Sequence, residues 1–210
     1  MKDFSIAMAL VDYIPVIFFG IAAIILLRDL YNKMSKGAFA LFAAGTIDVF
    51  AAGALKATYK LLYASNACDF ESLNAMFFPV QSIGFLLAGI GIIAMLCFKQ
   101  EKKVALLSTA PVLFKGTFLF VGLMVAGLGC MDAGLCYLSA KLKKPAIIVL
   151  FVISFICSLG MGYLSSKDFA EASMNWIAEG VNVVGQGCLL GGVWMLHKAG
   201  LGEYKLPQKK

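Results

Sequence analysis

The sequence predicts an all-α protein, a polytopic bundle of transmembrane helices in which seven helices are favoured. Of its 210 residues, 61% are hydrophobic and only 14% are charged, and the mean hydropathy is +0.88. Soluble domains average roughly half apolar and a quarter charged residues. Long apolar runs follow one another with short polar links. Because a helix needs roughly 20 apolar residues to cross the hydrocarbon, the chain has room for about six or seven spans. We expect a single transmembrane domain over residues 1–210 and no soluble domain beside it.

The apolar runs define the expected elements in order. They cover residues 4–27, 37–63, 74–98, 104–140, 145–164 and 174–196. The first run is interrupted by Asp12 and has no small-residue cleavage site, so we interpret it as a permanent span rather than a cleaved signal peptide. The run at 104–140 is too long for one straight helix and short for two. Charge has to decide between these readings.

Basic residues mark one side of the membrane, because cytoplasmic loops carry an excess of Lys and Arg. They cluster at Arg28, Lys33 and Lys36, at Lys99, Lys102 and Lys103, at Lys141, Lys143 and Lys144, and at Lys198, Lys205, Lys209 and Lys210. The other loops carry Asp69 and Glu71, or Lys167 with Asp168 and Glu171. Seven crossings put every basic cluster on one side, with the N-terminus outside and a short basic tail, residues 199–210, in the cytoplasm. We therefore expect an integral protein of the cytoplasmic (inner) or plasma membrane.

A turn within the long run fits this count. Lys115, Gly116 and Thr117 supply a cation for the end of one helix, a glycine after it and a hydroxyl to cap the next. The fourth helix is then expected at about 100–115 and the fifth at about 117–141. The alternative is six spans, with a kinked or re-entrant fourth segment.

A weak internal repeat supports seven helices. Residues 76–96 align without gaps on 174–194, which places Gln81 over Glu179 and Gly89 over Gly187. Helices one to three and five to seven would form two parallel repeats joined by helix four, an arrangement known among transporters.

Charged residues inside the spans are the main functional candidates, and they are Asp48, Lys56, Asp132 and Glu179. Each costs about 2.5–3.5 kcal/mol at the centre of a lipid-facing helix, so they should face the bundle interior or water. We expect Lys56 to pair with Glu179. Asp48 or Asp132 could carry a coupling proton or cation, and Lys56 could recognise an anionic group.

Amide side chains extend this polar set. Glu179, Asn182 and Gln186 share one helix face, and Gln81 is expected at a similar depth. The seven residues could line a cavity that opens to the outside. They could instead be interhelical hydrogen bonds that only hold helices in register. Lys60 and Asp12 lie nearer the expected membrane boundary, where they could extend toward water.

Glycines recur in the third, fifth and seventh helices, and Gly187 and Gly191 form a GxxxG spacing. This spacing permits close helix packing within the chain, and homodimerisation is the alternative.

Several classes of function are disfavoured. His197 is the only histidine, and the six cysteines form no CxxC motif, so no metal site, cofactor or disulfide framework is expected. The sequence contains no motif that pairs a nucleophile with a base, so we do not expect an enzyme. The net charge of +6 lies in the basic turns, where lipid headgroups explain it, so no nucleic-acid partner is expected.

The sequence therefore predicts a small membrane protein, with the lipid bilayer as its surroundings, that binds or transports a small polar solute or ion, which could be anionic, through an outward-facing polar cavity. The alternative is a receptor-like or accessory membrane subunit that contacts a cytoplasmic or membrane partner.

Overall fold

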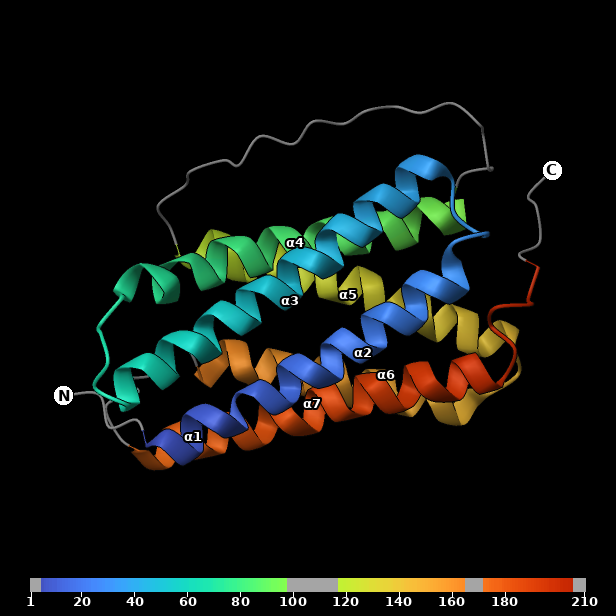
Figure 1. Cartoon of the computed structure of the whole chain (residues 1–210). Helices are drawn as coiled ribbons and strands as arrows, with labels where there is room; N and C mark the ends of the chain where they lie inside the picture. Colours follow the sequence, from blue (N-terminus) through green and yellow to red (C-terminus); the bar gives the residue numbers. More distant parts are fainter. Residues whose placement is uncertain (1–4, 98–116, 165–171, 206–210) are drawn as a thin grey trace.

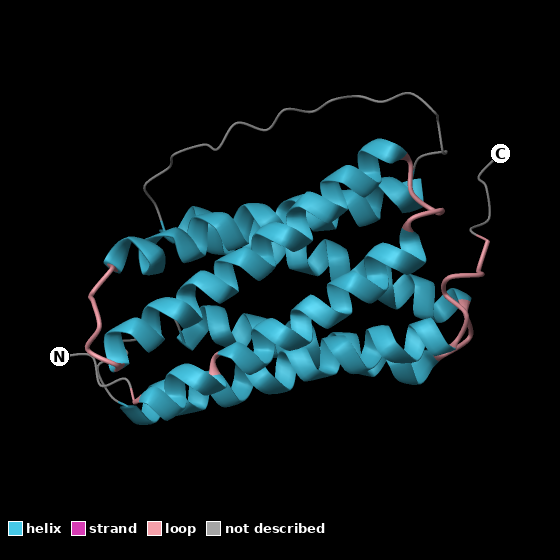
Figure 2. Cartoon of the chain, in the orientation of Figure 1, coloured by secondary structure: helices cyan, strands magenta, loops and turns pink. Residues whose placement is uncertain are grey.

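The computed structural model describes residues 5–97, 117–164 and 172–205, and this part of the chain is all helical. The helices are α1 (Ile6–Val11), α2 (Tyr13–Leu30), α3 (Lys36–Ala64), α4 (Glu71–Cys97), α5 (Thr117–Lys141), α6 (Pro145–Leu164) and α7 (Ala172–Lys198). Figures 1 and 2 show them side by side along one direction, with loops at the two ends of the bundle. The helix expected at 100–115 lies outside the described residues.

Five of the described helical segments are long and apolar enough to cross a membrane. They are 6–30 (α1 with α2), 36–64, 71–97, 119–141 and 145–164. The remaining long helix, α7, packs against α2 and α6 and is less apolar. Isoleucines such as Ile17 and Ile24 are exposed on the outside of the bundle, as expected for side chains that meet lipid. The protein is an integral membrane protein.

The first span is broken at Asp12, which ends α1 and begins α2. Pro15 explains the break, because proline has no amide hydrogen and its ring crowds the carbonyl group four residues earlier, that of Val11. Ser5 caps the N-terminus of α1, and its hydroxyl accepts a hydrogen bond from the Met8 amide at 3.1 Å. The run expected at 4–27 forms one candidate span, residues 6–30, with this break inside it.

The turns at the other end of the bundle follow simple rules. Ser35 caps α3 by accepting a hydrogen bond from the Ala38 amide. Pro145 is the first residue of α6, the position where proline fits a helix best. Gly200 follows α7 with φ of 86°, and the Leu201 amide donates to the Leu196 carbonyl.

The long helices form a closed ring in which α2, α3, α4, α5, α6 and α7 each contact the next, and α7 contacts α2. Two neighbouring pairs run parallel. In one pair, Gly89 and Ile92 of α4 lie against Gly127 and Gly134 of α5, in the same order along both helices. In the other, α2 and α7 run together in Figure 1. The ends that residues 98–116 connect, Cys97 and Thr117, therefore lie at opposite ends of the bundle.

Glycines allow the closest approaches in this ring. A Cβ atom on Gly45 would lie 2.4 Å from the Gly84 carbonyl oxygen of α4, and one on Gly89 would lie 2.4 Å from the Gly127 oxygen of α5. In contrast, a Cβ atom on Gly187 or Gly191 would meet only side-chain atoms of neighbouring helices, at 3.7 and 3.8 Å respectively. The tightest helix contacts therefore use α3, α4 and α5 rather than the GxxxG spacing in α7.

The hydrophobic core fills the end of the bundle that carries the basic turns. Its fully buried members include Leu30, Phe42, Leu135, Leu138 and Leu196. The core is continuous across α2 to α7. This leaves the other half of the bundle for polar residues.

Candidate functional site

A cavity of about 510 Å³ lies in the half of the bundle opposite the basic turns. All the long helices and the α1–α2 break contribute residues to its wall. Its size is within the range of small-molecule sites. The surrounding wall combines a buried ionic cluster, amide side chains and an aromatic surface.

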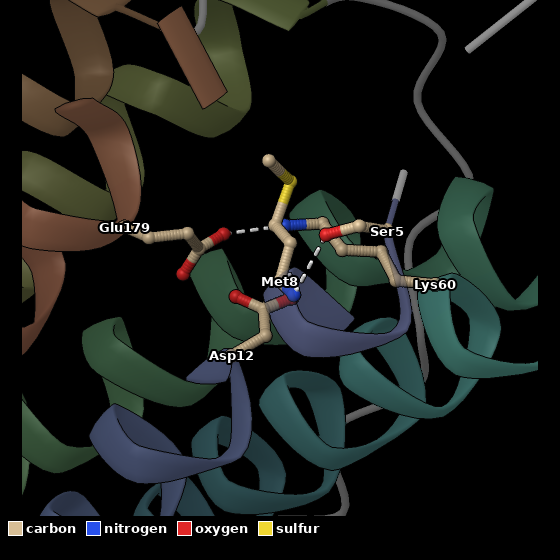
Figure 3. Close-up of polar contacts among 5 residues, drawn as sticks. All are labelled: Ser5, Met8, Asp12, Lys60 and Glu179. Atoms are coloured by element: carbon tan, nitrogen blue, oxygen red, sulfur yellow. Dashed lines mark hydrogen bonds and ion pairs between the residues drawn. The ribbon is translucent and has the colours of Figure 1, made fainter. Parts of the chain in front are cut away.

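The ionic cluster joins three helical segments (Figure 3). Lys60 Nζ of α3 lies 2.5 Å from Glu179 Oε1 of α7 and 2.9 Å from Asp12 Oδ2 at the α1–α2 break. The exposed fractions are 6% for Lys60, 6% for Asp12 and 4% for Glu179. One ammonium group therefore contacts two carboxylates away from bulk water.

This arrangement corrects two expectations. The cation that pairs with Glu179 is Lys60 rather than Lys56, because Lys60 lies one helical turn nearer the C-terminal end of α3. Lys60 and Asp12 do not extend into the boundary region, since both are buried in the cluster. Pro15 was the available signal, because a proline at this position predicts a break that can turn Asp12 inward.

Lys56 lines the cavity next to this cluster. Its Nζ lies 4.0 Å from the centre of the Phe77 ring, a cation–π contact. In the described part of the chain, no carboxylate forms an ion pair with it. Lys56 is therefore the cavity's cation that a ligand can reach most directly.

Amides complete the polar side of the wall. Gln81, Asn182 and Gln186 line the cavity as the sequence predicts, and Asn175 joins them. Two buried acceptors, Glu179 Oε2 and Gln186 Oε1, have no hydrogen-bond partner among the described residues. Such atoms are costly to bury, so a ligand or solvent that donates hydrogen bonds fits here.

Two predicted site residues lie elsewhere. Asp48 of α3 is half-buried, and Asp132 of α5 is 4% exposed, but neither lines the cavity. Both Asp132 carboxylate oxygens are buried without a hydrogen-bond partner within the described ranges. The structure thus brings together Lys56, Gln81, Glu179, Asn182 and Gln186 and leaves Asp48 and Asp132 apart.

Apolar and aromatic side chains form the rest of the wall. They include Phe19, Val49, Phe50, Phe77, Phe78, Phe85, Met124, Leu128 and Met161. Sequence reasoning missed this surface because aromatic residues in apolar helices normally face lipid or core. The cavity therefore suits a molecule with a polar head and an apolar body.

The opposite end of the bundle is closed by polar links as well as by the core. Asp29 Oδ2 of α2 lies 2.9 Å from His197 Nδ1 of α7, and Lys33 Nζ donates to the Gly202 carbonyl at 2.6 Å. Burial lowers the pKa of the Lys33 ammonium group, and the nearby Asp29 carboxylate partly opposes this. These links hold α2 to the end of α7 on the basic side.

No group of three or more His, Cys, Asp or Glu residues in the described ranges could hold a metal ion. All six cysteines are free.

Comparison with known proteins identifies no relative of this chain. The chain matches no family model, no curated protein and no solved structure. The fold and site define the class, an integral membrane helical bundle, and the function is argued from the cavity itself.

Proposed function

We propose that this protein binds a small polar solute in the cavity and moves it across the membrane. The observation that carries the proposal is the buried Asp12–Lys60–Glu179 cluster in the wall of a 510 Å³ cavity. Ionisable groups inside a membrane are expensive to keep, and they typically mark a solute or ion pathway. The aromatic wall and the amides are the composition of a small-molecule site.

The position of the cavity supports an outward-facing form. The cavity lies away from the basic turns, and the core with the Asp29–His197 link closes the basic end. Because basic loops are cytoplasmic in most membrane proteins, the closed end is the cytoplasmic one and the N-terminus is outside. A transporter alternates between this form and one that opens inward.

Seven crossings and a parallel repeat belong to the same proposal. Parallel packing of α4 and α5 supports seven crossings, since the chain has to return across the membrane between them. Residues that line the cavity also recur 109 residues apart along the chain. This separation relates α2 to α5 and α3 to α6. The pairs are Pro15 with Met124, Phe19 with Leu128, Val49 with Ser158, and Gly53 with Gly162. Gln81 of α4 and Glu179 of α7 have a different separation, but both line the cavity, and together with the four pairs they favour two equivalent halves around it.

Topology reporters test the number of crossings. Alkaline phosphatase, active outside, and green fluorescent protein, fluorescent inside, are fused after Cys97 and after Gly116 in separate truncated chains. Seven crossings predict an inside reporter after Cys97 and an outside reporter after Gly116. The same side for both fusions would establish six.

Uptake by reconstituted vesicles tests the function. The panel contains amino acids, organic acids, sugars and inorganic ions, each radiolabelled. We expect uptake of at least one solute by the natural chain and loss of that uptake in Gln81→Trp, which fills the cavity. Ile24→Trp is the matched control, because Ile24 is 67% exposed on the outer surface. Uptake that survives in Gln81→Trp, or no uptake of any solute, would contradict the proposal.

In the receptor-like or accessory alternative, the exposed Lys143 and Lys144 turn would contact another protein. A partner that copurifies with the natural chain and is lost when both lysines are replaced by glutamine would favour that alternative.

A further inference from the structure

The charged and hydrogen-bonding groups of the cavity that have no ion-pair or hydrogen-bond partner among the described residues define what a ligand has to supply. Lys56 offers an ammonium group whose only described close contact is the Phe77 ring. Glu179 Oε2 and Gln186 Oε1 are buried acceptors without a donor among the described residues. A matching ligand therefore carries an anionic acceptor for Lys56 and one or more N–H donors for the two oxygens.

The net charge of the cavity wall further limits which ligands can bind. Lys60 balances only one of the two carboxylates that it touches, Asp12 and Glu179. Lys56, next to them in the wall, supplies a second positive charge. The four groups together are neutral when all are ionised. In a cavity of low dielectric constant, a lone anion or a lone cation would leave a net charge, whereas a zwitterion leaves none.

The spacing of the charged groups fits a compact zwitterion. Lys56 and Lys60 are one helical turn apart on α3, about 6 Å along the axis. Glu179 lies at the level of Lys60, since the two are in contact. A carboxylate and an ammonium group on a single carbon atom can therefore reach Lys56 and Glu179 at the same time.

The rest of the ligand meets an apolar wall. Phe50, Phe77 and Phe78 surround this side of the cavity, and Phe19, Phe85 and Met124 continue the wall toward the middle of the bundle. Flat or branched apolar groups pack well against aromatic rings. A strongly polar side chain would lose its water here without gaining partners.

We propose that the cavity binds a zwitterion of the α-amino acid class with an apolar side chain, its carboxylate on Lys56 and its ammonium group on Glu179. This inference rests on the proposed function, because it names the solute of the same site. It differs from an expectation of a simple anion, since the ammonium group is part of the recognition.

Three probes with one ring and different charges test the inference. They are phenylalanine, 3-phenylpropionate, which lacks the ammonium group, and phenethylamine, which lacks the carboxylate. Binding to the purified full-length protein in lipid nanodiscs is measured by isothermal titration calorimetry. We expect phenylalanine to bind roughly tenfold or more tightly than either single-charge analogue, the typical effect of losing one charge-assisted hydrogen bond.

Variants assign the two ends of the ligand. Lys56→Met should weaken phenylalanine binding by roughly tenfold or more and make phenylalanine no better than phenethylamine. Glu179→Gln should remove the advantage of phenylalanine over 3-phenylpropionate. Asp48→Asn is the matched control, because it removes a carboxylate within a span but outside the cavity, and it should leave all three affinities unchanged.

Each outcome decides something different. Equal binding of 3-phenylpropionate and phenylalanine would overturn the zwitterion and leave an anion site, and equal binding of phenethylamine would leave a cation site. No binding of any probe would overturn the inference. Uptake of another solute that Gln81→Trp abolishes would still support the proposed function, so the two failures are distinguishable.

Discussion

Lys60 is the residue on which the site depends most. It is the cation in contact with both buried carboxylates, Asp12 and Glu179. The Lys60→Met variant keeps much of the apolar stem but leaves two like charges without their counter-ion. Removal of one partner from a buried ion pair typically costs about 3–5 kcal/mol. We expect a large fall in the melting temperature of the purified protein in detergent, followed by circular dichroism.

A neutral version of the cluster separates charge from packing. The quadruple variant Asp12→Asn, Lys56→Met, Lys60→Met, Glu179→Gln should recover most of the lost stability, because no unpaired charge remains in this wall. Lys36→Met, an exposed site at the start of α3, serves as the control and should melt like the natural chain. A quadruple variant as unstable as Lys60→Met alone would mean that the cluster does not act through charge.

Most of the polar cavity wall could be predicted from residue type. The cost of burying Lys56 and Glu179 in lipid and the shared helix face of Glu179, Asn182 and Gln186 identified residues that the structure brings together. The same reasoning put Asp48 and Asp132 in the site, which the structure does not. The free-energy cost of burying a charge in lipid indicates that the charged side chain faces the inside of the bundle. It does not indicate whether the side chain lies in the cavity or elsewhere between the helices.

At the scale of helices, glycine contacts set how closely α4 and α5 pack. A Cβ on Gly127 would lie 2.4 Å from the Leu86 amide nitrogen and from the Phe85 carbonyl carbon. Because both atoms belong to the backbone, the helices would have to separate. We expect Gly127→Ala to destabilise the protein by about 1–3 kcal/mol, the usual cost of overpacking, measured by melting in detergent.

Gly122 provides the matched control in the same helix. A Cβ there meets nothing within 4 Å. Gly122→Ala should be neutral or slightly stabilising, since alanine favours helix more than glycine does. Equal losses in both variants would show that the tight α4–α5 contact contributes nothing specific.

Helix positions could be predicted well because crossing lengths and turn residues constrain them together. The segments expected at 117–141 and 145–164 have the bounds that α5 and α6 show, and Pro145 begins α6. The break at Asp12 was missed, because hydropathy does not register the carbonyl that Pro15 leaves without a donor. That local break contributes one of the three charges in the cluster.

For the whole molecule, the two ends of the bundle differ in a way that sequence composition did not specify. Basic turns predicted which end faces the cytoplasm, but the location of the space between the helices depends on side-chain packing. Large buried residues such as Phe42 and Phe151 fill the basic half, whereas polar residues leave the other half open. The proposed function therefore requires a wet cavity that is open outward and closed inward.

Labelling from outside tests this claim most directly. In a background with the six native cysteines replaced by alanine and a melting temperature like that of the natural chain, Asn182→Cys places a thiol in the cavity, and Ser139→Cys places one in the closed half, where Ser139 is fully buried. Intact cells are treated with a membrane-impermeant methanethiosulfonate reagent. If the cavity opens outward, we expect that Asn182→Cys reacts and that Ser139→Cys does not. An Asn182→Cys thiol that stays unreactive from outside, or reacts only from the cytoplasmic side of inverted vesicles, would contradict it.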